Sequence, residues 1–71
     1  MEREKMVKWA VEEFREYGVM EEEVRWGVEI VSRMKWYNSE QRVMKGIRDY
    51  LYEVKGYEIP MRVGRYKKLE D

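Results

Sequence analysis

Residues 39–56, SEQRVMKGIRDYLYEVKG, decide the fold because they carry the most complete helix signal in this chain. Ser39 is a favourable N-cap residue, and Gly56 suits the left-handed conformation that commonly follows a helix. Between them, apolar residues recur every three or four positions. They form one expected buried stripe of Val43, Ile47, Leu51 and Val54, with Met44 and Tyr50 beside it. This pattern predicts a helix over residues 40–55.

Two more helices are expected upstream. The first, over residues 2–17, carries an apolar stripe and precedes Gly18, a typical residue at a helix end. The stripe consists of Val7, Ala10, Val11, Phe14 and Tyr17. The second, over residues 20–35, begins with three glutamates in the turn where the helix dipole favours negative charge. Its stripe consists of Val24, Val28, Val31 and Met34, with Gly27 beside it as an expected point of close packing.

After Gly56 the apolar period changes from helical to alternating, over residues 57–63. Pro60 restricts this stretch to an edge strand or an extended docking arm. A short hairpin about Gly64 and an extended tail across the helices are both open. The expected fold is therefore a single all-α domain over residues 1–71. It has three helices and an extended or β-hairpin C-terminal arm, or wing, over residues 57–71.

The composition indicates a small protein from a reducing compartment. A chain of 71 residues buries only about 60% of its unfolded surface, so the core is expected to be marginal. The absence of cysteine excludes disulfides and the common zinc sites. No apolar run reaches the length of a membrane span, and the N-terminus lacks the apolar core of a signal peptide. We expect a cytoplasmic protein, and the wealth of Glu, Lys and Arg favours a thermophilic source.

An enzymatic role is not expected. The chain has no histidine and no cysteine, which removes the commonest general bases, nucleophiles and metal ligands. Ser32 and Ser39 are the only hydroxyl nucleophiles apart from the tyrosines, and Ser39 is better explained as a helix cap. The five glycines are scattered singly, so no phosphate-binding loop is present. We expect no catalytic residue, metal or cofactor.

Charge is distributed unevenly along the chain. Residues 1–30 hold five bases and nine acids, whereas residues 31–71 hold ten bases and six acids, for a net charge of zero. This asymmetry indicates an anionic partner for the basic half. Attraction between the two halves, or to a second copy of the chain, is the alternative.

The third helix and the tail carry the candidate nucleic-acid-binding residues. A second face of that helix bears donors that read base edges or hold phosphates, and the tail adds bases around Tyr66. The helix residues are Gln41, Arg42, Lys45, Arg48 and Tyr52, and the tail residues are Arg62, Arg65, Lys67 and Lys68. Solvated surface is the alternative explanation for each base.

Residues 28–69 loosely resemble helix-turn-helix DNA-binding domains, including winged ones. Ile30, Val31 and Met34 match the packing face of the motif's first helix, and Ser39 opens the helix that matches the recognition helix. Residues 57–69 match the wing. The segment over residues 35–38 is longer than the usual turn and lacks its glycine. The resemblance implies a dimeric, DNA-binding transcription regulator.

Aromatic residues support a competing role. The chain has more large rings than its predicted core stripes use, and protein interfaces favour such residues at their centres. The candidate interface to a partner or a second copy consists of Trp9, Trp26, Ile30 and Trp36. Packing of Trp26 and Trp36 around the small core is the alternative. We therefore expect a nucleic-acid-binding protein, for DNA or RNA, and as the alternative a module that binds or inhibits a larger protein.

Overall fold

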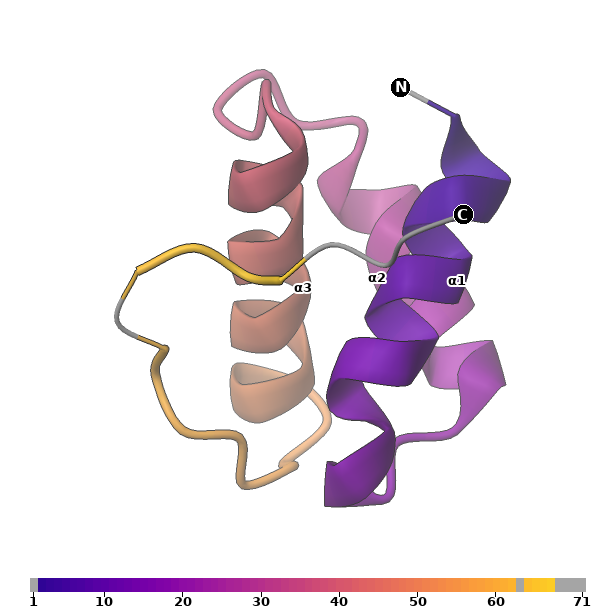
Figure 1. Cartoon of the computed structure of the whole chain (residues 1–71), viewed down its shortest axis with the longest axis vertical. Helices are drawn as coiled ribbons and strands as arrows, with labels where there is room; N and C mark the ends of the chain where they lie inside the picture. Colours follow the sequence, from indigo (N-terminus) through magenta and orange to yellow (C-terminus); the bar gives the residue numbers. More distant parts are fainter. Residues whose placement is uncertain (1, 63, 68–71) are drawn as a thin grey trace.

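The computed structural model describes residues 2–62 and 64–67, which form three helices crossed by a C-terminal arm (Figure 1). Helix α1 spans Arg3–Phe14 and continues as a 3₁₀ turn, η1, over Arg15–Tyr17. Helix α2 spans Glu21–Val31, and helix α3 spans Glu40–Glu53. The three predicted helices are confirmed.

The helix ends follow the local signals with small differences. Gly18 adopts a left-handed conformation (φ 76°) after η1, and the Ser39 hydroxyl accepts a hydrogen bond from the Arg42 N–H of α3 at 3.3 Å. Helix α2 ends at Val31, four residues before the expected end, and α3 ends at Glu53. Two residues predicted for the buried stripes, Met34 and Val54, therefore lie beyond the last helical turn and are exposed.

The core lies between the three helices and the arm. The buried apolar residues are Met6, Val7, Trp9, Ala10, Phe14, Val24, Val28, Val31, Val43, Met44, Ile47, Leu51, Ile59 and Tyr66. Most belong to the predicted stripes, and Ile59 and Tyr66 come from the arm. The expected interface role of Trp9 is corrected: its ring is buried, and its indole N–H donates to the carbonyl of Lys67 at 2.7 Å.

Helices α2 and α3 approach closely at two glycines. A Cβ atom added at Gly46 would lie 2.6 Å from Cγ1 of Val31 and 2.8 Å from Cε1 of Tyr37. At Gly27 the corresponding distances, to Ile47 and Tyr50, are 3.3 Å. The close packing expected beside Gly27 is present, and it is tighter at Gly46.

Of the two forms expected for the C-terminal arm, the β-hairpin is not supported, and the described residues follow an extended path. The arm leaves the end of α3, loops outward and returns across that helix toward α1, without a strand among the described residues (Figure 1). Its backbone is bonded by side chains rather than by a partner strand, and Ile59 and Tyr66 enter the helical core. Residue 63 and residues 68–71, which include the expected site residue Lys68, lie outside the described residues.

Candidate nucleic-acid interface

Arg48 of α3 anchors the arm to that helix. Its side chain is buried, and its Nε and Nη2 atoms donate to the carbonyl of Ile59 at 3.0 and 2.7 Å. Its Nη1 atom donates to the carboxylate of Asp49 at 3.0 Å. A buried guanidinium needs such partners, because an uncompensated buried charge is strongly destabilising. We therefore remove Arg48 from the set of residues available to a nucleic acid and assign it to holding the arm.

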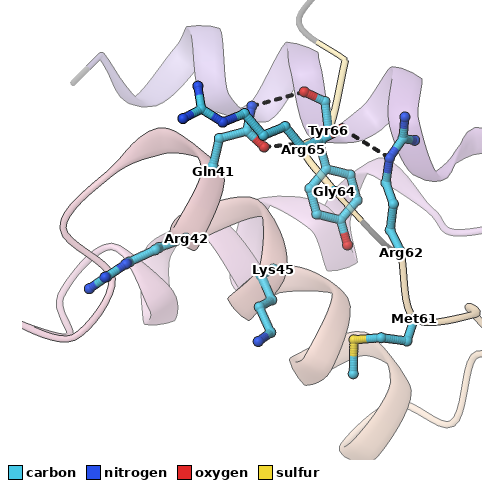
Figure 2. A pocket seen from close by; sticks show the side chains of 8 residues that line it. All are labelled: Gln41, Arg42, Lys45, Met61, Arg62, Gly64, Arg65 and Tyr66. Carbon is cyan, nitrogen blue, oxygen red and sulfur yellow. Dashed lines mark hydrogen bonds between the residues drawn. The ribbon is translucent and has the colours of Figure 1, made fainter.

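Gln41 makes the second anchor. Its amide nitrogen donates to the carbonyl of Tyr66 at 2.8 Å, and its amide oxygen accepts from the Tyr66 N–H at 2.7 Å (Figure 2). Both polar atoms of the side chain are thus occupied by one backbone residue. The sequence places Gln41 on the expected reading face, whereas in the structure it fixes the position of the arm.

The arm and the first half of α3 enclose a shallow hollow lined by bases. Its lining consists of Gln41, Arg42, Lys45, Met61, Arg62, Gly64, Arg65 and Tyr66, without an acidic residue (Figure 2). Residues of α3 and of the arm that are 16 to 25 positions apart in sequence are thereby brought together. The hollow measures about 180 Å³, below the roughly 300–1,000 Å³ of typical small-molecule sites. The hollow is therefore too small to enclose a typical small-molecule ligand.

The cations around this hollow are mostly not neutralised by carboxylates. Arg42 contacts the neutral carbonyl of Trp36 at 3.4 Å and the amide oxygen of Asn38 at 3.5 Å. Lys45, Arg65 and Lys67 are exposed, and none forms an ion pair within the part of the chain that the structure describes. We refer to Arg42, Lys45, Arg65 and Lys67 as the open cations.

Arg62 differs from these four residues. Its Nη1 atom lies 2.6 Å from the Glu13 carboxylate of α1, and its Nε donates to the carbonyl of Arg65. Its guanidinium also lies 5.4 Å from the centre of the Tyr66 ring. Arg62 is thus a third anchor of the arm, with its charge largely compensated.

On α1, α2 and the residues that follow each helix, the arginines are paired with glutamates. The ion pairs join Arg3 to Glu29, Arg15 to Glu12, Arg25 to Glu4, Arg25 to Glu21, and Arg33 to Glu29, where Arg15 belongs to η1 and Arg33 follows α2. The hydrogen bond from Arg25 lowers the pKa of Glu4 below its ordinary value, so this carboxyl stays ionised. The uneven charge of the sequence therefore becomes a division between a compensated α1–α2 side and an uncompensated α3–arm side.

Two exposed rings flank the open cations. Trp36, in the connection before α3, is 69% exposed, and Tyr52, near the end of α3, is 48% exposed. Tyr52 was expected at the nucleic-acid site, whereas Trp36 was assigned to a protein interface. In the structure the guanidinium of Arg42 lies 5.0 Å from the ring centre of Trp36. The signal in the sequence was the helical arginine six residues after the tryptophan, which is too common a spacing to be specific.

The remaining interface candidates lie on α2. Trp26 is 56% exposed, and Ile30 is half-buried. Neither residue lines the hollow between α3 and the arm.

Within residues 2–62 and 64–67, no helix is both long enough and apolar enough to cross a membrane. The same residues include no group of three or more acidic side chains placed to hold a metal ion. Comparison of the chain with known family models, curated proteins and solved structures finds no match. The fold and the site thus define the class only: a three-helix protein with a docked arm and a basic, ring-flanked surface.

Proposed function

We propose that this protein binds nucleic acid through the α3–arm surface formed by the open cations. The observation that carries the proposal is that three of the open cations, Arg42, Lys45 and Arg65, line a hollow without an acidic lining residue, and the exposed Lys67 follows two residues after Arg65. Phosphate neutralisation by Lys and Arg supplies most of the non-specific affinity for nucleic acids. Zero net charge weakens long-range attraction, so the affinity is expected to rest on this local surface.

A strong dependence on salt follows from phosphate contacts. If the four open cations each neutralise one phosphate, raising the salt from about 50 to about 200 mM lowers the affinity by about 50-fold for a single strand and about 150-fold for a duplex. Fluorescence anisotropy with labelled oligonucleotides at the two salt concentrations measures this loss.

A double charge reversal tests the location of the surface. Arg42→Glu with Lys45→Glu should abolish measurable binding, because it replaces two of the open cations by carboxylates that repel phosphates. The variant should remain folded, since both side chains are exposed and neither belongs to the core. The matched control is Lys8→Glu on α1 with Arg15→Glu on η1, which changes the net charge by the same amount away from the α3–arm surface. Equal effects of the two double variants would reject the α3–arm surface as the binding site.

The α3–arm surface is also the surface that a helix-turn-helix regulator would use. A dimeric DNA-binding transcription regulator, as the helix-turn-helix resemblance implies, is the version of this proposal in which the ligand is duplex DNA. It requires α3 to enter a major groove.

As a second candidate function, we propose that α2 binds a protein partner or a second copy of the chain through Trp26. The specific observation is that this large ring is 56% exposed, apart from the basic hollow. Sedimentation of the parent protein and of Trp26→Lys over a range of concentrations tests self-association, and co-purification tests other partners. A parent protein that stays monomeric and captures no partner contradicts this second function.

A further inference from the structure

The two rings that flank the open cations each lie against an arginine side chain. The Arg42 guanidinium lies 5.0 Å from the ring centre of Trp36 and also donates to the carbonyl of that residue. The Arg48 guanidinium lies 4.5 Å from the ring centre of Tyr52 and is itself fixed by the carbonyl of Ile59. Each ring thus has one face against a guanidinium, and its large exposed fraction comes from the remaining surface.

The rings and the cations share one side of the molecule. Lys45 and Tyr52 are seven residues apart on α3, which places them on the same face at a separation of about 10 Å along the axis. Trp36 lies against Arg42 in the first turn of that helix. The order along this side is therefore an aromatic ring, two cationic side chains and a second aromatic ring: Trp36, Arg42, Lys45 and Tyr52. The nucleobases of a single strand are free to unstack and bind to aromatic faces of this kind, while Lys and Arg side chains contact the nucleic-acid backbone between them.

Insertion of α3 into a duplex is opposed by its surroundings. The arm crosses the helix and occupies the amide of Gln41, the side chain best suited to read an adenine edge.

We propose that the α3–arm surface binds single-stranded nucleic acid, with Trp36 and Tyr52 each stacking on a base and the open cations contacting phosphates. This inference rests on the proposed function and specifies its ligand class. It assigns to Trp36 a role in nucleic-acid binding rather than in a protein interface.

The test is an anisotropy titration of the full chain with a labelled 12-nucleotide oligo(dT) and with a mixed-sequence 12-base-pair duplex, at about 50 mM salt. We expect the single strand to bind at least about tenfold more tightly than the duplex. Trp36→Leu and Tyr52→Leu keep apolar contact with the arginines but remove the aromatic face. Each should weaken single-strand binding by about 5- to 150-fold, the range for loss of one base stack. Trp36→Phe should retain most of the affinity.

Trp26→Leu is the matched control, because it removes an exposed indole from α2 and should leave the affinity unchanged. In a Trp26→Phe background, the emission of Trp36 should be quenched by oligo(dT), since Trp9 is buried. Circular dichroism verifies that each variant is folded.

The outcomes separate this inference from the proposed function. Equal or tighter binding of the duplex overturns the single-strand assignment and leaves nucleic-acid binding in place. Unchanged affinity in folded Trp36→Leu and Tyr52→Leu overturns the stacking role in the same way. Failure of both oligonucleotides to bind at about 50 mM salt overturns both proposals.

Discussion

Gly46 is the residue at which substitution is most restricted by packing. Its backbone lies against Val31 of α2 and the ring of Tyr37, so the Cβ atom of Gly46→Ala would lie 2.6 Å from Val31 Cγ1. Alanine is favoured over glycine in a helix by about 1 kcal/mol, but overpacking a core costs about 1–3 kcal/mol. We expect a net loss of stability of up to about 2 kcal/mol in urea denaturation followed by circular dichroism.

Gly27→Ala serves as the matched control for that prediction. The added Cβ would lie 3.3 Å from Ile47 and Tyr50, where a small shift of the side chains relieves the contact. Its effect should be smaller than that of Gly46→Ala. The packing explanation fails if Gly46→Ala stabilises the protein or if the two variants are equally affected.

Gln41 positions the arm through two hydrogen bonds to Tyr66. Gln41→Ala removes both bonds, and a typical intramolecular hydrogen bond contributes about 0.5–1.5 kcal/mol. We expect a loss of stability of about 1–3 kcal/mol, faster hydrogen exchange of the Tyr66 amide, and weaker oligonucleotide binding although no charge is lost. Unchanged protection of that amide would show that the arm does not depend on Gln41.

The roles of individual polar residues were only partly predictable from the sequence. Helical spacing correctly places Gln41, Lys45 and Tyr52 along one side of α3. The turning of Gln41 and Arg48 toward the arm was missed, because their partners lie 25 and 11 residues away in an irregular segment. A periodic pattern identifies a face of a helix but does not identify a backbone segment that covers it.

The docking of the arm is expected to depend on pH through Tyr66. Tyr66 is buried in the core, and this burial, the largest cause, raises the pKa of its phenol above the ordinary value. The folded state then holds the phenolic proton more tightly than the unfolded chain does. The resulting contribution to stability is complete below pH of about 10 and is lost as the pH rises through the raised pKa.

We therefore expect the thermal midpoint to fall at strongly alkaline pH and the arm to detach from α3. Tyr66→Phe removes the titrating group while keeping the ring, so its midpoint should fall less steeply over the same range. Tyr17 and Tyr57, whose phenol pKa values are also raised, remain in both proteins. An equally steep fall in Tyr66→Phe would exclude Tyr66 as the source of the alkaline loss.

The three helices are determined by residues close in sequence, whereas the path of the arm depends on residues far from it in sequence. The periodic stripes, Ser39 and Gly18 predict the three helices because a helix is formed by neighbours in sequence. The alternating pattern of residues 57–63 was read as a hairpin strand or an extended tail. The tail is formed because the anchors on α3, rather than a second strand, bond its backbone.

For the molecule as a whole, the division of charge links fold and proposed function. Glutamates compensate the arginines of α1 and α2, whereas the arm brings additional bases to α3 without equivalent acids. The sequence shows that the second half is more basic, but the pairing of Arg62 with Glu13 and the burial of Arg48 require the folded arrangement. The proposed nucleic-acid surface consequently has fewer basic residues than the set expected from the sequence.

The measurement that best tests this surface is an NMR titration of ¹⁵N-labelled protein with the 12-nucleotide oligo(dT) at about 50 mM salt. We expect amide shifts concentrated at residues 36–52 and in the described part of the arm up to residue 67, with little change along the outer side of α1 and α2. Shifts centred on α1 or α2, or no shifts at saturating oligonucleotide, would contradict binding at the α3–arm surface.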